Sequence, residues 1–174
     1  MLFRSSDPPV PRLEPEPVDL TASGESVIRQ LTGQAARSGI TLKMKAAGEV
    51  WAEADARAVR QIWQNLVSNA VKYSDSGKTV TLETRIEGGA AQLSVTDRGA
   101  GIAGADLAKL TEPFAQGTGA KPGTGLGLSV VRRFAELHGG SLKISSKPGK
   151  GTRVEVTLPC AAETDIAPLE EAAE

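Results

Sequence analysis

The chain has 174 residues, a formal net charge of −1, 40% hydrophobic and 24% charged residues, the composition of one soluble globular domain. No apolar run approaches the roughly 18 residues of a membrane span, and the start has no signal-peptide core. One cysteine, one histidine, two Trp, one Tyr and three Phe argue against a disulfide framework, a His-rich or thiolate metal site and a base-stacking nucleic-acid surface. We therefore expect a cytoplasmic domain that inserts into no membrane and binds no nucleic acid.

The two ends differ in composition from the middle. Five of the ten prolines fall between Pro8 and Pro17, which predicts a proline-rich linker over residues 1–18. Residues 160–174 hold five acidic residues and no basic ones, which predicts a flexible acidic tail, with an autoinhibitory arm as the alternative. One compact domain is then expected over residues 19–159.

Hydrophobic spacing predicts helices and strands in a mixed order. Helical periodicity and end signals predict helices, and two-residue alternation predicts strands. The expected helices cover residues 19–39, 55–73, a short piece at 106–110, and 125–138; the expected strands cover 40–46, 80–86, 91–95, 142–145 and 152–158. A segment of undefined structure around Val50 leads into the second helix. Because the order has no regular βαβ repeat, we expect an α/β two-layer sandwich, with a mixed, largely antiparallel sheet packed against about three helices.

The second expected helix carries a polar face. Asn65, Asn69 and Lys72 recur at helical spacing, opposite much of the apolar stripe. Two carboxamides and an ammonium group suit a polyanion with its cation, because carboxamide oxygens ligate hard metals and lysine pairs with phosphate. A solvated helix face is the alternative.

Asp97 continues the alternation of Ala91, Leu93 and Val95, so its carboxylate is expected on the buried side of a strand. A buried carboxylate needs a donor, which the exocyclic amine of a base would provide. The alternative is an Asp that caps the turn before Gly99.

Two glycine motifs have misleading forms. Gly99 to Gly104 reads G-x-G-x-x-G, but no long helix or βαβ unit follows, so a dinucleotide-binding fold is not indicated. Gly77-Lys78-Thr79 resembles the end of a P-loop, but Lys72 stands where the first glycine is needed.

A third glycine motif suits an anion. The run from Gly123 to Leu128 opens the last long helix, where free backbone N–H groups can approach a phosphate. Residues 116–123 lack apolar anchors and are expected to form a mobile lid over a nucleotide.

Together these motifs resemble the ATP-binding catalytic domain of bacterial sensor histidine kinases, in the superfamily that also contains DNA gyrase. The resemblance covers about residues 16–159 and has four boxes in the family's order. The N box corresponds to residues 65–74, the first glycine box to 97–102, the F box to 112–114 and the second glycine box to 123–128. The resemblance implies a Bergerat-type fold.

The resemblance also implies roles for individual residues. Asn69 would ligate Mg²⁺ with help from Asn65, and Lys72 would pair with phosphate oxygens of ATP. Tyr73 and Ile102 would pack on adenine, Asp97 would accept from its amino group, and Thr152 would support that contact. The hinges of the lid and its phosphate-facing amides would come from Gly99, Gly101, Gly123, Gly125 and Gly127. Phe114 would pack the lid, Lys121 would reach the γ-phosphate, and the nucleotide-binding set would also include Thr124, Leu126 and Leu128.

The implied reaction is transfer of the γ-phosphoryl group of ATP to a histidine, with a response regulator downstream. Sensor kinases carry that histidine on a preceding helical hairpin, and this chain has no such segment. We therefore expect the acceptor and dimerisation domain to be separate, and the chain alone to be a monomer. His138, the only histidine, is expected to cap the last helix, where the helix dipole would favour it.

Two positions depart from related patterns. Arg98 stands where the family often has Asn, and Asn65 stands where the ATPase relatives have a catalytic glutamate, so water activation should be weak. Two other functions stay open: a non-catalytic docking or degenerate kinase module, and an anti-sigma-factor serine kinase.

Overall fold

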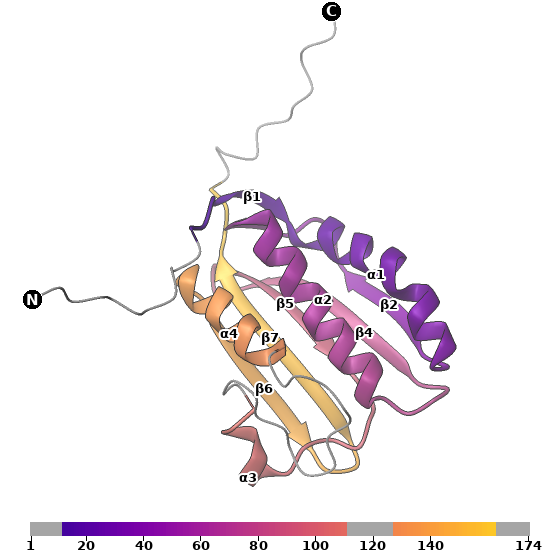
Figure 1. The fold of residues 1–174 in the computed structure, drawn as a ribbon. Helices are drawn as coiled ribbons and strands as arrows, with labels where there is room; N and C mark the ends of the chain where they lie inside the picture. The colour runs from indigo at the N-terminus through magenta and orange to yellow at the C-terminus, as the bar shows by residue number, and fades with distance from the viewer. Residues whose placement is uncertain (1–11, 111–126, 163–174) are drawn as a thin grey trace, which may run out of the picture.

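The structure, a computed structural model, describes residues 12–110 and 127–162. Its body is a five-stranded sheet with three helices side by side on one face (Figure 1). The helices are α1 (Leu20–Arg37), α2 (Ala56–Tyr73) and α4 (Gly127–Leu137); the one-turn α3 (Gly104–Leu107) contacts β6. The strands are β1 (Glu16–Asp19), β2 (Thr41–Ala46), β3 (Trp51–Ala54), β4 (Thr79–Glu87), β5 (Ala90–Thr96), β6 (Ser141–Lys147) and β7 (Gly151–Pro159).

The main sheet has the strand order β2-β4-β5-β7-β6. Only β2 and β4 are parallel, and the other three neighbouring pairs are antiparallel. The expected two-layer sandwich with a mixed, largely antiparallel sheet is confirmed. The glycine pair Gly88-Gly89, both with positive φ, turns β4 into β5 as the hairpin pattern predicts.

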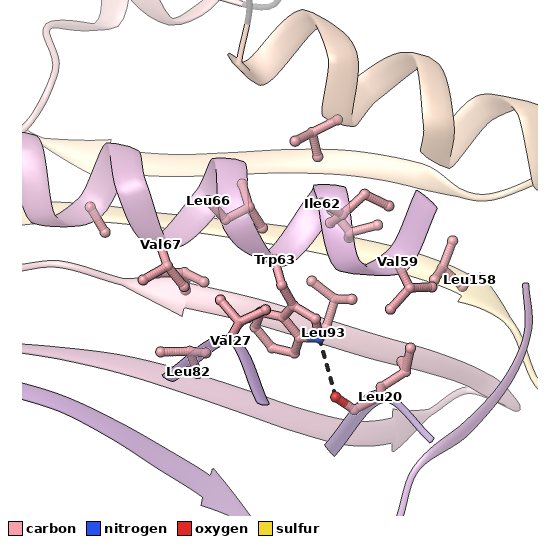
Figure 2. Packing of buried hydrophobic residues seen from close by; sticks show 14 of the residues in the cluster. Leu20, Val27, Val59, Ile62, Trp63, Leu66, Val67, Leu82, Leu93 and Leu158 are labelled. Carbon is pink, nitrogen blue, oxygen red and sulfur yellow. Dashed lines mark hydrogen bonds between the residues drawn. The ribbon is translucent and has the colours of Figure 1, made fainter. Parts of the chain in front are cut away.

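Helix α2 forms the centre of the core. The Asp55 carboxylate starts it by accepting hydrogen bonds from the backbone N–H groups of Arg57 (2.9 Å) and Ala58 (3.2 Å). Its apolar stripe faces the sheet, where the fully buried Trp63 donates from Nε1 to the carbonyl oxygen of Leu20 at 3.2 Å (Figure 2). The buried side holds α2 on the sheet, so its other side is free to carry polar groups.

The chain ends of the domain meet at β3, which the sequence left undefined. β1 pairs with one side of β3, and on the other side Cys160 bridges to Ala52. Residues 16–18, which are expected in the linker, therefore form part of a small sheet. Residues 160–161, which are expected in the tail, contact β3, and the Ala161 N–H donates to the Trp51 carbonyl oxygen. A four-residue strand containing Pro17 has too little pattern to separate from a proline-rich linker.

Two expected helix bounds also differ. The short helix α3 occupies residues 104–107 and not 106–110. The last helix is described from Gly127, and its expected start at Gly125 lies outside the described residues.

Candidate functional site

The polar face of α2 lies against the first turn of α4. The Asn65 side chain accepts a hydrogen bond from Gln61 Nε2 at 2.9 Å and donates from Nδ2 to the Gly127 carbonyl oxygen at 3.4 Å. A Cβ atom on Gly127 would lie 3.1 Å from Asn69 Nδ2, so α4 begins in close contact with this side chain. The helix can approach the Asn69 carboxamide this closely because residue 127 is glycine.

The end of α2 meets the loop that follows β5. A Cβ atom on Gly99 would lie 2.0 Å from the Tyr73 carbonyl oxygen, so only glycine permits this approach. Lys72 Nζ lies 5.2 Å from the centroid of the Tyr73 ring, and 37% of Tyr73 is exposed. The C-terminal end of α2, which carries Lys72 and Tyr73, therefore lies against the backbone at Gly99.

Asp97 extends the inward-facing row of β5 and is buried, with 8% of its surface exposed. Its Oδ1 accepts from the Gly99 N–H at 2.9 Å, and its own N–H donates to the Thr152 carbonyl oxygen at 2.9 Å. The carboxylate therefore faces inward, as its alternation predicts, and it also caps the turn before Gly99. Burial raises its pKa, against the lowering effect of the backbone hydrogen bonds from Gly99 and Thr152, and nearby Asp75 raises it further.

The loop carrying Gly101 and Ile102 is fastened to the β6–β7 turn. Gly101 has φ +71°, and a Cβ atom there would lie 2.0 Å from the Lys147 carbonyl oxygen. The Ile102 N–H donates to Ser146 Oγ at 2.8 Å, and Ser146 Oγ lies 2.8 Å from Thr152 Oγ1. Sequence reasoning did not single out Ser146. The sequence pattern that could have identified it is the two-residue alternation of Leu142, Ile144 and Ser146, which puts a polar residue on the inward face of β6.

The described site therefore brings together the polar face of α2, Asp97, the 99–102 loop, Thr152 and the start of α4. Leu128 is half-buried and packs against the core on α4. The remaining expected site residues, Phe114, Lys121, Gly123, Thr124, Gly125 and Leu126, lie outside the described residues.

A comparison with protein families matches residues 54–162 to the family described as "Histidine kinase-, DNA gyrase B-, and HSP90-like ATPase". The chain belongs to this family. It is 42% identical over 145 residues to the histidine protein kinase DivJ of Caulobacter vibrioides, a match that covers 81% of this chain. The chain spans only 24% of the length of DivJ.

Solved structures give the same assignment for the fold of this histidine kinase-type domain. Full-length ShkA in complex with AMPPNP superposes with a TM-score of 0.77 at 30% identity, covering 88% of this chain and 33% of ShkA. The mycobacterial sensor histidine kinase MprB gives a TM-score of 0.74 at 28% identity, covering 84% of this chain and 98% of the MprB chain. No helix in the described part of the domain is both long and apolar enough to cross a bilayer.

A polar cavity of about 610 Å³ opens beside the C-terminal half of α2 in this histidine kinase-type domain. Asn69 and Lys72 border it together with Gln34 and Ser38 from the end of α1. The described residues around the cavity include none from the 99–102 loop. Asn69 and Lys72, two residues of the expected site, therefore border a cavity on the side of α2 that faces α1.

His138 closes the far end of α4, away from Gly127. Its Nδ1 lies 2.6 Å from the Phe134 carbonyl oxygen, and its Nε2 accepts from the Asp55 N–H at 3.0 Å. The expected cap is confirmed, but its basis differs from the dipole argument. Because a backbone N–H can only donate, Nε2 is the acceptor of this bond, and the ring links the end of α4 to the start of α2.

Proposed function

We propose that the chain binds ATP together with Mg²⁺ and transfers the γ-phosphoryl group to a histidine on a separate phosphoacceptor and dimerisation domain. A response regulator would then take the phosphoryl group from that histidine. Because the chain spans a fraction of its curated relatives, this activity is inferred from the site and from family membership.

The base end of the site carries the proposal. Asp97 is a buried carboxylate at the end of β5 with a raised pKa, and the Gly99 that it caps lies against the backbone of Tyr73. The exocyclic amino group of adenine would donate to this carboxylate and offset the cost of its burial. Tyr73 and Ile102 would pack on the base, and Thr152 would support the contact from β7.

The residues expected near the phosphates suit a metal ion that is bound mainly by the phosphate oxygens of the nucleotide. The described residues contain no cluster of three or more His, Cys, Asp or Glu that could hold an ion alone. Mg²⁺ is commonly bound by few protein oxygens plus substrate phosphates, and the carboxamide oxygens of Asn69 and Asn65 are suitable ligands. Bound Mg²⁺ would neutralise charge that develops on the phosphates.

The chain's own residues would orient the phosphates. Lys72 would pair with phosphate oxygens, and the start of α4 at Gly127 would direct backbone N–H groups toward them. Gly123, Thr124, Gly125, Leu126 and Leu128 would complete this anion site, while Phe114 and Lys121 would belong to the lid. The reaction then depends on holding the γ-phosphoryl group in line with the incoming histidine nitrogen.

Calorimetric titration with a non-hydrolysable ATP analogue tests the binding step. We expect Mg²⁺-dependent binding that Asp97→Asn weakens by roughly 10- to 100-fold, the scale of a lost hydrogen bond to a charged group. Glu25→Gln is the control, because it neutralises an exposed carboxylate on α1 that is not among the groups acting on Asp97. Absence of binding by the unmodified chain, or equal affinity in Asp97→Asn, would refute the site.

A further inference from the structure

The inner face of β6 changes from apolar to polar as it reaches the site. Ladder register pairs Leu142 with Val156 and Ile144 with Val154. Val156 lies in the core, Leu142 and Val154 pack against it, and Ile144 is half-buried. The next pair on the same face is Ser146 with Thr152, whose hydroxyl oxygens lie 2.8 Å apart.

Asp97 completes this polar row. It follows Val95, which is the register partner of Val154 on β7, and its backbone N–H donates to the Thr152 carbonyl oxygen at 2.9 Å. The end of the sheet therefore presents Asp97, Thr152 and Ser146 in one row, on the side that faces the 99–102 loop.

Ser146 Oγ uses its full hydrogen-bonding capacity. It accepts from the Ile102 N–H at 2.8 Å and lies 2.9 Å from the Gly151 carbonyl oxygen. A serine hydroxyl has one proton and two acceptor sites. Since the carbonyl must receive that proton, Thr152 donates to Ser146, which fixes the rotamers of both hydroxyl groups.

The 99–102 loop is attached at three points, and each holds a different residue. Gly99 donates to Asp97 Oδ1 at 2.9 Å, and the Ala100 carbonyl oxygen accepts from the Gly149 N–H at 2.6 Å. The third attachment is the bond from Ile102 to Ser146. Ile102 is half-buried, and this contact fixes the position of its backbone.

We propose that Ser146 is a positioning residue for the nucleotide base, acting through the backbone of Ile102 and the hydroxyl of Thr152. This inference rests on the proposed function, because it assigns Ile102 and Thr152 to the base end of an ATP site. Ser146 itself touches neither the base nor the phosphates. It fixes the surface on which the base packs, and its removal affects recognition of the base and leaves the phosphate contacts in place.

The test uses the full chain with Ser146→Ala, Ser146→Thr and the control Ser145→Ala, an exposed neighbour on the opposite face of β6. Affinity for the Mg²⁺-bound ATP analogue is measured by calorimetry, and affinity for adenosine by ligand-observed NMR. We expect Ser146→Ala to weaken both ligands by the same factor, about 3- to 30-fold, the scale of one or two hydrogen bonds. Ser146→Thr keeps the hydroxyl and restores affinity, and Ser145→Ala matches the unmodified chain.

Amide hydrogen exchange at Ile102 gives an independent readout, since Ser146→Ala removes its acceptor and exchange becomes faster. Equal nucleotide affinity in Ser146→Ala, or a loss confined to the phosphorylated ligand, overturns the role of Ser146 while ATP binding by the unmodified chain stands. Failure of the unmodified chain to bind the ATP analogue refutes the proposed function, and this inference with it.

Discussion

Substitution of Asp55 by alanine should destabilise the fold more than loss of any exposed carboxylate. The side chain is 5% exposed and accepts from the backbone N–H groups of Glu14 (2.9 Å), Arg57 (2.9 Å) and Ala58 (3.2 Å). An N-cap contributes about 0.5–2 kcal/mol, and one further hydrogen bond to a buried charged group about 1.5–3 kcal/mol. The Arg57 side chain is 74% exposed, so its ion pair adds little.

We therefore expect Asp55→Ala to lower the free energy of unfolding by about 2–4 kcal/mol, measured by urea denaturation. At this chain length that corresponds to a Tm lower by roughly 5–15 °C. Asp55→Asn keeps an N-capping oxygen and should recover about half of the loss. Glu25→Ala, an exposed acid on α1, is the control and should change stability by less than about 0.5 kcal/mol.

The pH dependence of this difference follows from the charge of Asp55. Burial raises its pKa, but the Arg57 side chain and the backbone N–H donors outweigh burial and hold the pKa well below the usual value. A depressed folded-state pKa stabilises the protein above the unfolded value of about 3.9, and this stabilisation is lost as pH falls toward the folded value. The gap between the unmodified chain and Asp55→Ala should be constant from about pH 5 to 8 and narrow below about pH 4. A loss under about 1 kcal/mol, or a gap that widens in acid, would refute the reasoning.

Three further outcomes follow from the site and its supports. Burial raises the folded-state pKa of Asp97, so the contribution of this group to stability is complete below about pH 3.9 and is lost as pH rises. Asp97→Asn should therefore be more stable than the unmodified chain at pH 7 without nucleotide, as measured by urea denaturation. A less stable variant would contradict this. Gly151→Ala should abolish nucleotide binding in the calorimetric titration, since its Cβ would lie 2.1 Å from the Asp97 carbonyl oxygen. Gly149→Ala is the control: Gly149 also has a positive φ (+74°), but its Cβ would meet no other atom. This variant should lose only about 1–2 kcal/mol of stability and retain binding. His138→Phe should lower the free energy of unfolding in urea by about 1–3 kcal/mol, because the Asp55 N–H loses its acceptor, and unchanged stability would show that this contact contributes nothing.

Strong local patterns made most of the architecture predictable. The apolar stripe of α2, its Asp55 cap and the alternation of β4 and β5 each determine one element without information from the rest of the chain. The strands β1 and β3 were not predictable, since they have four residues each and depend on one another for pairing. The Cys160 bridge to β3 depends on the whole fold in the same way.

The candidate site was predictable where a motif carries its own chemistry. Asp97 was expected to face inward because its alternation with Val95 is local, and the structure confirms its burial. The contact of Ile102 with Ser146 joins residues 44 positions apart, so no local pattern contains it. The contact between His138 and Asp55 was missed for the same reason, because the two residues lie 83 positions apart.

Phosphoryl transfer in trans is the most direct test of the proposed function. The chain is mixed with radiolabelled ATP, Mg²⁺ and a separately purified phosphoacceptor hairpin from a sensor histidine kinase. We expect label on the histidine of the hairpin, labile in acid and stable in base, with none on His138. Acid-stable label on serine would instead indicate a serine kinase, and binding of ATP without any label on the hairpin would contradict the assignment as a kinase catalytic domain.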